Sequence, residues 1–436
     1  MAVPCFPNPA MASSFGRFVP DMGGSVNQDR LWRTIEELAA ITDPAHPYTR
    51  RSFSDLHVAG RAWLREQFLE AGLSPSLDAA ANLTGHLEGS QPELGAIVVG
   101  SHSDTVPDGG RFDGIAGVLS GLEVARALRD NGVKLRHGFQ VVDFLAEEPS
   151  TYGMSCVGSR ALAGVLSPEH LAFQEPGGET LAQAIDRMGG NTAKLTGPLR
   201  SPGEIAAYVE VHIEQGPVLE SGKIPAGIVT AIVGISRTNI HFTGRADHSG
   251  NTPMTMRRDA LLGASQLVVL ADQLARALNS DDDYFVGTVG KLDVEPNASN
   301  IVPGAVSMCL EYRSNSTPAR ASYIAAMTEH AKRIAKELDL EVSFEAVSDA
   351  EPAICDDAVR GAIRDACEKL GSPHLDMPSG AGHDAMHVSR IAPMGMIFIP
   401  CLAGRSHCAD EWVSSEDLAA GANVLFETVR ALDARL

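Results

Sequence analysis

Short apolar runs rich in β-branched residues alternate with stretches of helical spacing, and this alternation constrains the fold more than any other feature. The runs lie at residues 96–100, 138–145 and 207–213. Residues 115–129, between the first two runs, have helical periodicity, and residues 27–41 and 54–71 read as amphipathic helices. Because continuous apolar strands are typical of sheets covered by helices on both faces, the pattern predicts an α/β layer with a largely buried sheet.

A second unit interrupts this pattern at residues 229–346. Its strands and helices are expected in the order strand, helix, strand, strand, helix, strand, at residues 236–242, 257–278, 284–292, 305–312, 319–338 and 340–346. This order on one sheet is the ferredoxin-like α+β arrangement. Since the α/β pattern resumes after the insert, we predict one discontinuous domain of residues 27–228 and 347–436, preceded by a loose N-terminal arm at residues 1–26.

The charge and cysteine content of the chain exclude several classes of protein. Lys and Arg total 35 against 55 Asp and Glu, and the formal net charge of -20 argues against binding to nucleic acids or anionic membranes. The longest apolar runs fall far short of the roughly 20 residues that span a bilayer. Seven cysteines, an odd number without a CxxC motif, are typical of reduced thiols. We therefore expect a cytoplasmic protein with no membrane span.

The first apolar run leads into a glycine-rich stretch, GSHSDTVPDGGRFDGIAG, at residues 100–117. It carries His102 and Asp113 where α/β folds place functional side chains. Taken alone, the two residues are equally consistent with a structural histidine and a helix N-cap. Further ligands are needed to decide between a structural and a metal-binding role.

The ends of the other apolar runs supply such ligands. VVDFLAEEPS carries Glu147 and Glu148, AYVEVHIEQG carries His212, and IPCLAGRSHCADEW carries His407. Loops and ends of the predicted sheet thus hold five nitrogen and oxygen ligands, namely His102, Asp113, Glu148, His212 and His407. Imidazole and carboxylate ligands suit Zn, Mn, Co or Ni, and a single bridging Asp can hold two cations close together. This set favours a metal site over five unrelated structural residues.

Two further acids have expected roles beside these ligands. Adjacent residues at a strand end point in different directions, so Glu148 can bind a metal while Glu147 stays free as a general base. Asp104 follows His102 by two residues and is expected to accept a hydrogen bond from that imidazole, fixing its tautomer. The set therefore predicts a metal site that has its own base.

In their order along the chain, these motifs resemble the M20 family of metallo-aminohydrolases. The motifs, collinear from about Leu31 to the C-terminus, are GSHSDT, GGRFDGIAG, AEE, VHIEQG and GRSHCADE. HIEQGPVLE is similar to the hydantoinase/carbamoylase branch, which includes N-carbamoyl-L-amino-acid hydrolases, β-ureidopropionases and allantoate amidohydrolases. The resemblance implies a metallopeptidase-like catalytic domain with a mixed sheet flanked by helices. It also implies that the insert is a lid and dimerisation domain of a homodimer.

The resemblance further implies roles for individual residues. It places two divalent metal ions, one on His102, Asp113 and His212 and the other on Asp113, Glu148 and His407. Glu147 falls on the position of the catalytic base. His248, in GRADHSGNTPM, falls on the position that reaches into the partner subunit's active site and polarises the scissile carbonyl. Without the resemblance, His248 would be interpreted as a turn histidine.

Substrate contacts are implied in the same way. The matching positions are Gln215, Asn300, Arg313 and Gly382. Asn300 and Arg313 match the residues that bind the substrate's carboxylate, and an Arg fork suits that task and supplies local positive charge in an acidic chain. His212 lies where peptidase members generally have a carboxylate, which points away from a dipeptidase.

The reaction so implied is metal-dependent hydrolysis of a non-peptide C–N bond in an N-carbamoyl amino acid or related ureido acid, releasing amino acid, ammonia and carbon dioxide. Two departures from the family pattern leave the substrate open. Residues 149–152 are PSTY, where the branch usually has the motif G-x-R-F. Ala409 stands where the family usually has Pro. One alternative is an amidase for another carboxylate-bearing substrate, such as an N-acyl amino acid or allantoate. Another is a non-catalytic binding protein, which the complete ligand set disfavours. The chain has no G-x-S-x-G elbow that would indicate a serine hydrolase.

Overall fold

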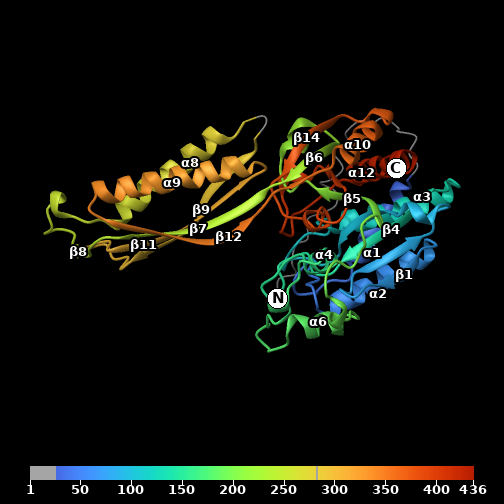
Figure 1. Ribbon diagram of the computed structural model, residues 1–436, viewed down its shortest axis with the longest axis horizontal. Coiled ribbons are helices and arrows are strands. Elements are labelled where there is room, and N and C mark those ends of the chain that lie inside the picture. Colours follow the sequence, from blue (N-terminus) through green and yellow to red (C-terminus); the bar gives the residue numbers. More distant parts are fainter. Residues whose placement is uncertain (1–25, 281–282) are drawn as a thin grey trace, which may run out of the picture.

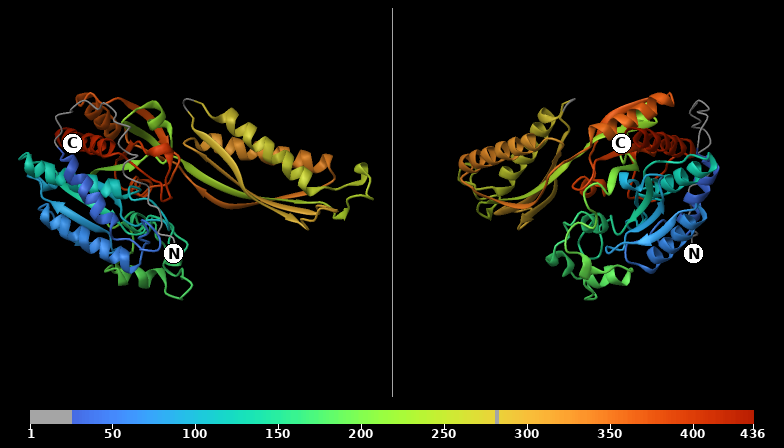
Figure 2. Two further views of the ribbon diagram at one scale, coloured as in Figure 1. Left: turned by 180° about the vertical axis from the view of Figure 1, so that it is seen from behind. Right: turned by 45° about the vertical axis from the view of Figure 1, so that its right-hand side comes forward.

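Two parts of unequal size make up the molecule (Figure 1). The computed structural model describes residues 26–280 and 283–436. A large part carries both ends of the described chain, and a long narrow part formed by residues 234–350 projects from it (Figure 2). Apart from Val26, the N-terminal arm predicted at residues 1–26 lies outside the described residues.

The large part is built on a nine-stranded mixed sheet. Its order is β1–β2–β4–β3–β5–β15–β6–β13, with β14 beside β6. The strands are β1 (Ser74–Leu77), β2 (Leu83–Leu87), β3 (Ala96–His102), β4 (Gly138–Phe144), β5 (Ile205–Ile213), β6 (Ala226–Ile232), β13 (Ala353–Ile354), β14 (His374–Ser379) and β15 (Met394–Ile399). The four central strands β4, β3, β5 and β15 are parallel to one another, so their carboxyl ends meet at one edge of the sheet.

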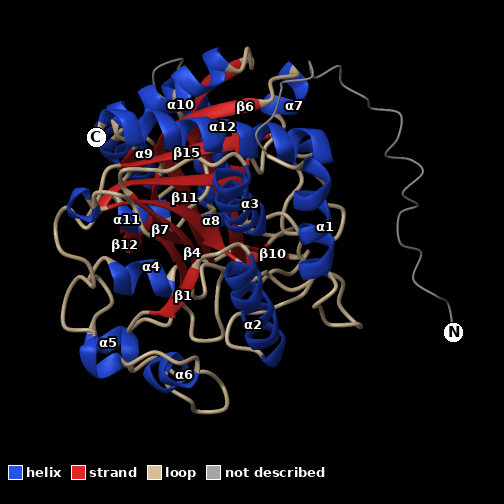
Figure 3. Cartoon of the chain, turned by 90° about the vertical axis from the view of Figure 1, so that its right-hand side faces the viewer, coloured by secondary structure: helices blue, strands red, loops and turns tan. Residues whose placement is uncertain are grey.

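Helices cover this sheet on both faces, as the apolar runs predict. Five long helices are packed together along one face, namely α1 (Gln28–Ala39), α2 (Asp55–Glu70), α3 (Ile115–Asp130), α10 (Asp357–Lys369) and α12 (Ser415–Arg435). Figure 3 shows α1 and α3 on one side of the strands and the short helix α4 (Val157–Leu162) on the other. In β3, Ile97 and Val99 join the core under the long helices, while Ala96 and Val98 join the core of the opposite face. The predicted helices at residues 27–41, 54–71 and 115–129 are confirmed.

Shorter helices complete the large part. They are α5 (Pro168–Leu171), α6 (Leu181–Arg187), α7 (Val218–Gly222) and α11 (Ala385–Val388). Helix α6 packs into a separate small core with the loop after β4, which includes Leu145 and Ala146.

The projecting part has its own four-stranded antiparallel sheet. In chain order its elements are β7 (Gly234–Thr243), α8 (Ala260–Leu278), β9 (Phe285–Glu295), β11 (Ala305–Ser314), α9 (Thr317–Glu337) and β12 (Glu341–Ala350). The strand order is β12–β7–β11–β9, and α8 and α9 share a hydrophobic core with one face of the sheet. A two-stranded ribbon of β8 (Asp247–His248) and β10 (Ile301–Val302) forms its far tip (Figure 1). All six strands and helices expected in this segment are present.

Helix α8 is the one helix among the described residues that could cross a membrane by length and composition alone. An 18-residue stretch of this helix has a mean hydropathy of 1.2, and 28% of that stretch is buried. Ala264, Leu267 and Ala271 pack into the core of the projecting part, while Leu262 and Val269 are exposed. A single helix of this kind is a weak indication of a membrane span.

Candidate metal centre

The parallel strands bring the predicted ligands to one edge of the sheet. His102 is the last residue of β3, and His212 is the next-to-last residue of β5. Glu148 follows β4, and His407 follows β15. Asp113 stands two residues before α3, in the glycine-rich loop that leaves β3. Residues from four strand ends and one loop therefore converge because the strands run in the same direction.

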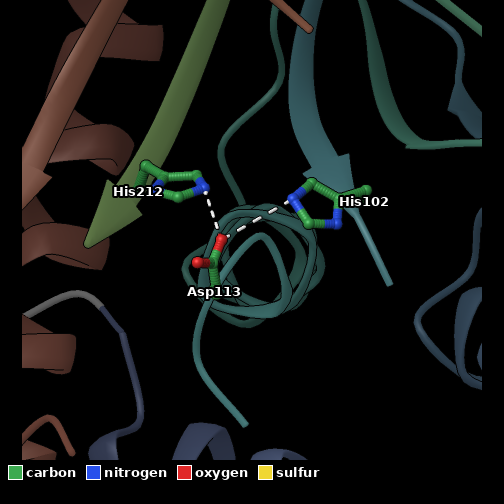
Figure 4. A group of neighbouring side chains, drawn as sticks. All are labelled: His102, Asp113 and His212. Carbon is green, nitrogen blue, oxygen red and sulfur yellow. Dashed lines mark ion pairs between the residues drawn. The ribbon is translucent and has the colours of Figure 1, made fainter. Parts of the chain in front are cut away.

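One group of ligands consists of His102, Asp113 and His212 (Figure 4). The Asp113 Oδ1 atom lies 3.1 Å from His212 Nε2 and 3.8 Å from His102 Nε2. All three residues are buried, and their ligand atoms lie within 4.8 Å of one another. Figure 4 shows both imidazoles directed toward the Asp113 carboxylate.

A second group shares Asp113 and adds Glu148 and His407. His407 Nε2 lies 3.3 Å from Asp113 Oδ2 and 3.4 Å from Glu148 Oε1. The His407 side chain is 50% exposed, so this group is open to solvent on one side. Because Oδ1 of Asp113 faces the first group and Oδ2 faces the second, the carboxylate lies between the two groups as a bridging ligand must.

A third group of potential ligands, Glu210, His212 and His383, shares His212 with the first. The Glu210 carboxylate already accepts hydrogen bonds from the Ser101 hydroxyl at 2.7 Å, the Tyr208 hydroxyl at 3.0 Å and the Ala385 amide at 3.2 Å. These donors satisfy Glu210 without a cation, so the first two groups are the stronger candidates.

Several side chains fix Asp113 in place. Gln215 Nε2 donates a hydrogen bond to Asp113 Oδ2 at 2.7 Å, and the Ser406 hydroxyl donates to the same oxygen at 2.5 Å. Glu411, which is 2% exposed, accepts hydrogen bonds from the backbone amides of Phe112 and Asp113. Ser406 and Glu411 are not among the predicted site residues, although both lie in the stretch GRSHCADEW that contains His407.

Asp104 differs from its expected role. The nearest acceptor for His102 Nδ1 is the backbone carbonyl of Asp104 at 3.0 Å, while the carboxylate Oδ1 lies 3.6 Å away. The Asp104 carboxylate instead accepts hydrogen bonds from the amides of Glu147 at 3.3 Å and Glu148 at 3.2 Å. The physical reason is that the chain turns after His102, which brings the carbonyl to the imidazole and the carboxylate to the loop after β4. Asp104 therefore fixes both the first imidazole and the Glu pair.

Glu147 lies beside the ligands without joining either group. Its Oε2 atom is 3.6 Å from His102 Nε2, and its side chain is 12% exposed. The preceding residue, Ala146, has a φ of 54°, and Gln215 and His407 have φ values of 55°. Left-handed backbone at a non-glycine residue costs on the order of 1 kcal/mol and persists where the surrounding structure enforces it. Three of the left-handed residues therefore lie in segments that enter the site.

Burial and neighbouring charge shift the pKa values of the acids. Burial raises the pKa of Glu148 to about 8, and the Asp113 carboxylate adds to this rise. Burial also raises the pKa of Glu147 well above its usual range, reinforced by the adjacent Glu148 carboxylate. For Asp113 burial acts in the same direction, but the His212 imidazole outweighs it and holds the pKa well below its usual range. The bridging position therefore carries the permanent negative charge.

The pKa values of the imidazoles shift in opposite directions. Burial lowers the pKa of His102 to about 4. Burial would also lower the pKa of His212, but the Asp113 carboxylate outweighs it and raises the pKa to about 9. The hydrogen bond to Asp113 raises the pKa of His407 to about 9. Protons on His212 and His407 therefore supply the positive charge that balances Asp113, and a metal cation must displace them to bind.

The donor set fits divalent transition metals. Each group offers imidazole nitrogen and carboxylate oxygen, which suit Zn, Mn, Co and Ni. Gln215 Oε1 is buried without a hydrogen-bond partner beside Asp113, so the pocket has acceptor capacity left over. This unpartnered acceptor beside the imidazole and carboxylate groups favours a cation site.

His248 and Asn300 lie apart from these ligands, at the far tip of the projecting part (Figure 1). His248 is exposed, and its Nδ1 atom accepts a hydrogen bond from the Gly250 amide at 3.1 Å. The Asn300 carbonyl accepts a hydrogen bond from the Ser249 amide at 2.9 Å. Within one chain, the structure therefore brings these two residues together but does not bring them to the metal ligands.

Arg313 lies at the other end of the projecting part, where it meets the large part. Its Nη1 atom donates a hydrogen bond to the Gly380 carbonyl at 2.6 Å, and its Nε and Nη2 atoms donate to Glu311 Oε1 at 2.9 Å and 2.7 Å. Gly382 follows in the same loop, and a Cβ atom at this position would meet nothing within 4 Å. Arg313 and Gly382 thus lie on neighbouring segments, while Gln215 contacts Asp113 directly.

The stretch Pro149–Tyr152, which differs from the usual sequence of the branch, is anchored in the large part by its two buried residues, Ser150 and Tyr152. Tyr152 is buried, its hydroxyl donates a hydrogen bond to Glu179 at 2.5 Å, and its ring meets Phe53 edge-on at 5.1 Å. Thr151, which stands at the position of the branch's usual Arg, is exposed. The turn therefore brings no charged side chain to the loop beside Glu147.

The profile described as peptidase family M20/M25/M40 matches residues 98–431 of this chain. An N-carbamoyl-L-amino acid amidohydrolase of Geobacillus stearothermophilus is 38% identical over 405 residues, covering 93% of this chain and 98% of the relative. A ureidoglycolate hydrolase of Arabidopsis thaliana is 34% identical over 421 residues, covering 94% of this chain and 87% of the relative. The solved structure of an amidase of the hydantoinase/carbamoylase family from Burkholderia multivorans has a TM-score of 0.88 and 37% identity, covering 94% of this chain and 98% of that one.

Proposed function

This chain belongs to peptidase family M20/M25/M40, and on that premise we propose that it is a metal-dependent amidohydrolase that cleaves a non-peptide C–N bond of an N-carbamoyl amino acid or related ureido acid. The observation that carries the proposal is the Asp113 carboxylate between two ligand groups, with Glu147 beside them and in neither group. The relatives named above support a ureido substrate, since they are an N-carbamoyl amino acid amidohydrolase and a ureidoglycolate hydrolase.

Two divalent cations fit the ligand groups. His102, Asp113 and His212 would hold one, and Asp113, Glu148 and His407 would hold the other. When bound, such cations lower the pKa of water and polarise the carbonyl that is attacked. The protein residues keep the imidazoles in their ligating tautomers: the His102 Nδ1 hydrogen bond goes to Asp104 O, and that of His212 goes to Ile213 O at 2.9 Å.

Glu147 acts as the general base and then as the acid. Its Oε2 atom faces the ligand groups, so it can take a proton from the attacking water and return it to the leaving nitrogen. The products are an amino acid and carbamate, which decays to ammonia and carbon dioxide.

The substrate's carboxylate is bound by positive charge supplied from the projecting part. Arg313 provides the guanidinium fork, and Gln215, Asn300 and Gly382 complete the contacts. Asn300 and His248 lie at the tip, so in this proposal they serve the active site of the partner subunit in a homodimer. Exposed apolar residues on α8, including Leu262 and Val269, support an interface there.

The domain division follows from this role. We propose that the projecting part, residues 234–350, is a ferredoxin-like lid that also dimerises, and that the large part is the catalytic domain. The boundaries predicted at residues 229 and 346 lie five and four residues too early, because β6 belongs to the large sheet and β12 continues to Ala350. The strand order β12–β7–β11–β9 supports the ferredoxin-like assignment. A cytoplasmic location remains a prediction from the cysteine content.

The test is a substrate panel run with Mn, Zn, Co and Ni. Purified protein is incubated with N-carbamoyl, N-formyl and N-acetyl amino acids, ureidoglycolate and allantoate, and ammonia and free amino acid are measured. We expect release of ammonia from N-carbamoyl amino acids. Hydrolysis of only N-acyl substrates would contradict the proposal and favour the alternative amidase.

A pair of variants tests whether Glu147 is the general base. Glu147→Gln should retain metal and lose turnover, because an amide cannot accept the proton. Glu214→Gln is the matched control, since Glu214 accepts amide hydrogen bonds from Val218 and Leu219 and does not face the ligand groups. A metal-loaded Glu147→Gln variant with normal turnover would refute the assigned role.

A further inference from the structure

The carboxylate of Glu147 has a second neighbour that the proposed reaction does not use. The Cys156 Sγ atom lies 3.3 Å from Glu147 Oε1, and Cys156 is buried at 7% exposure. A carboxylate can only accept hydrogen bonds, so the thiol is the donor in this contact. Burial and the negative charge of Glu147 raise the pKa of the Cys156 thiol well above its usual range, so the donor proton is retained.

The backbone holds Cys156 against the loop that carries Glu147. The amides of residues 156, 157 and 158 donate hydrogen bonds to the carbonyls of residues 147, 146 and 145, at 2.8, 3.0 and 2.8 Å. Cys156 has a φ of 55° and Ala146 a φ of 54°. Each left-handed residue costs on the order of 1 kcal/mol, so the hydrogen bonds must enforce both conformations. The thiol is therefore held in register with the carboxylate by the chain itself.

The two oxygens of Glu147 consequently have different surroundings. Oε1 receives the thiol, while Oε2 lies 3.6 Å from His102 Nε2, on the side of the metal ligands. A Glu carboxylate rotates broadly about its terminal bond unless a partner fixes it. In this site, the partner of Oε1 is Cys156.

We propose that Cys156 is a positioning residue for the general base, whose thiol holds Oε1 of Glu147 and thereby keeps Oε2 directed at the reacting groups. This inference rests on the proposed role of Glu147 as the base. Without the donor, a smaller fraction of molecules has Oε2 in the reactive orientation. Substrate binding depends on other residues, so the loss falls on kcat and not on KM.

Three variants test this role by steady-state kinetics with the metal-loaded enzyme. Cys156→Ala should lower kcat by roughly tenfold, with KM changed by less than about twofold and metal content unchanged. Cys156→Ser restores a donor and should remain within about threefold of the native kcat. Cys367→Ala is the matched control because Cys367 is likewise a buried free thiol, on α10 and far from the ligand groups in the sequence. The kcat of this variant should equal the native value.

An infrared measurement reads the contact without any substrate. The S–H stretching band of Cys156 is identified as the band missing from the Cys156→Ala spectrum. In Glu147→Gln this band should move to higher frequency, because a neutral amide oxygen is a weaker acceptor than a carboxylate. If N-carbamoyl substrates are not hydrolysed at all, the proposed function fails, and this band still decides whether the contact exists.

Three results would overturn the inference. They are a Cys156→Ala variant with native kcat, a Cys156→Ser variant as slow as Cys156→Ala, and an S–H band that is unchanged by Glu147→Gln. A Cys156→Ala variant that loses metal, or whose KM rises by as large a factor as its kcat falls, would indicate a purely structural role for Cys156. That result would also overturn the inference.

Discussion

Replacing Gly114 by Ala should damage the metal centre more than the fold. Gly114 has a φ of 68° and caps the N-terminus of α3, next to Asp113. A Cβ atom at this position would lie 2.2 Å from His102 Nε2, the nitrogen that faces Asp113, whereas ordinary contacts begin at 3.4 Å. The imidazole or the loop must therefore move by more than about 1 Å, while metal–ligand distances tolerate only about 0.2 Å.

The magnitude follows from two contributions. Left-handed backbone at a residue with a Cβ costs roughly 1–2 kcal/mol, and overpacking against a buried side chain costs about 1–3 kcal/mol. We expect Gly114→Ala to lower the free energy of unfolding by about 2–5 kcal/mol and to weaken metal binding by roughly 100-fold or more.

A matched control separates these contributions. Gly132 has a φ of 64°, and a Cβ there would meet nothing within 4 Å. Gly132→Ala should therefore show the backbone cost alone and bind metal normally. Urea unfolding with and without Mn, together with metal content after dialysis, measures both quantities. If Gly114→Ala binds as much metal as Gly132→Ala, the proposed geometry of the first ligand group is refuted.

Other predictions concern acids, protons and assembly. Asp104→Asn should lower kcat by roughly 10- to 100-fold, measured on the best substrate of the panel, because an amide holds the Glu-pair loop less strongly; native kcat would contradict this. Because the pKa of Glu148 is about 8, a bound metal ion must displace its proton. The affinity for Mn, measured by titration calorimetry, should therefore rise from about pH 6 to about pH 8, and an affinity that does not change with pH would contradict this. Burial lowers the pKa of His387 to about 3, whereas the unfolded chain has a value of about 6.5. Because the unfolded state therefore binds the proton first, the free energy of unfolding falls as the pH drops from about 6.5 to about 3. His387→Leu should flatten the slope of unfolding free energy against pH by up to about 1.4 kcal/mol per pH unit, and an unchanged slope would exclude this origin. Leu262→Glu with Val269→Glu should convert the proposed dimer to a monomer in light scattering, and an unchanged dimer would move the interface elsewhere.

The grouping of the candidate ligands could be predicted from the sequence because it follows from strand direction. His102, His212 and His407 each lie at or soon after the end of an apolar run. Parallel strands place such ends at one edge, so periodicity and motif order were sufficient to group them. The order of strands and helices in the projecting part was also predictable, because each segment has a clear hydrophobic periodicity.

The supporting contacts could not be predicted in this way. Glu411 accepts amide hydrogen bonds from residues about 300 positions earlier in the chain, and nothing in its local sequence distinguishes it from a solvated turn acid. The Asp104 carboxylate turns to the Glu pair because of the loop path after His102, which periodicity does not describe. Cys156 reaches Glu147 because its own backbone is left-handed at the start of α4, and a cysteine gives no sequence signal for that conformation.

Anomalous diffraction from crystals of the Mn-loaded protein tests the central claim most directly. Two peaks are predicted, with the Asp113 carboxylate between them, one contacting His102 and His212 and the other contacting Glu148 and His407. A single peak, or peaks that do not share Asp113, would contradict the account of this site as a bridged two-metal centre.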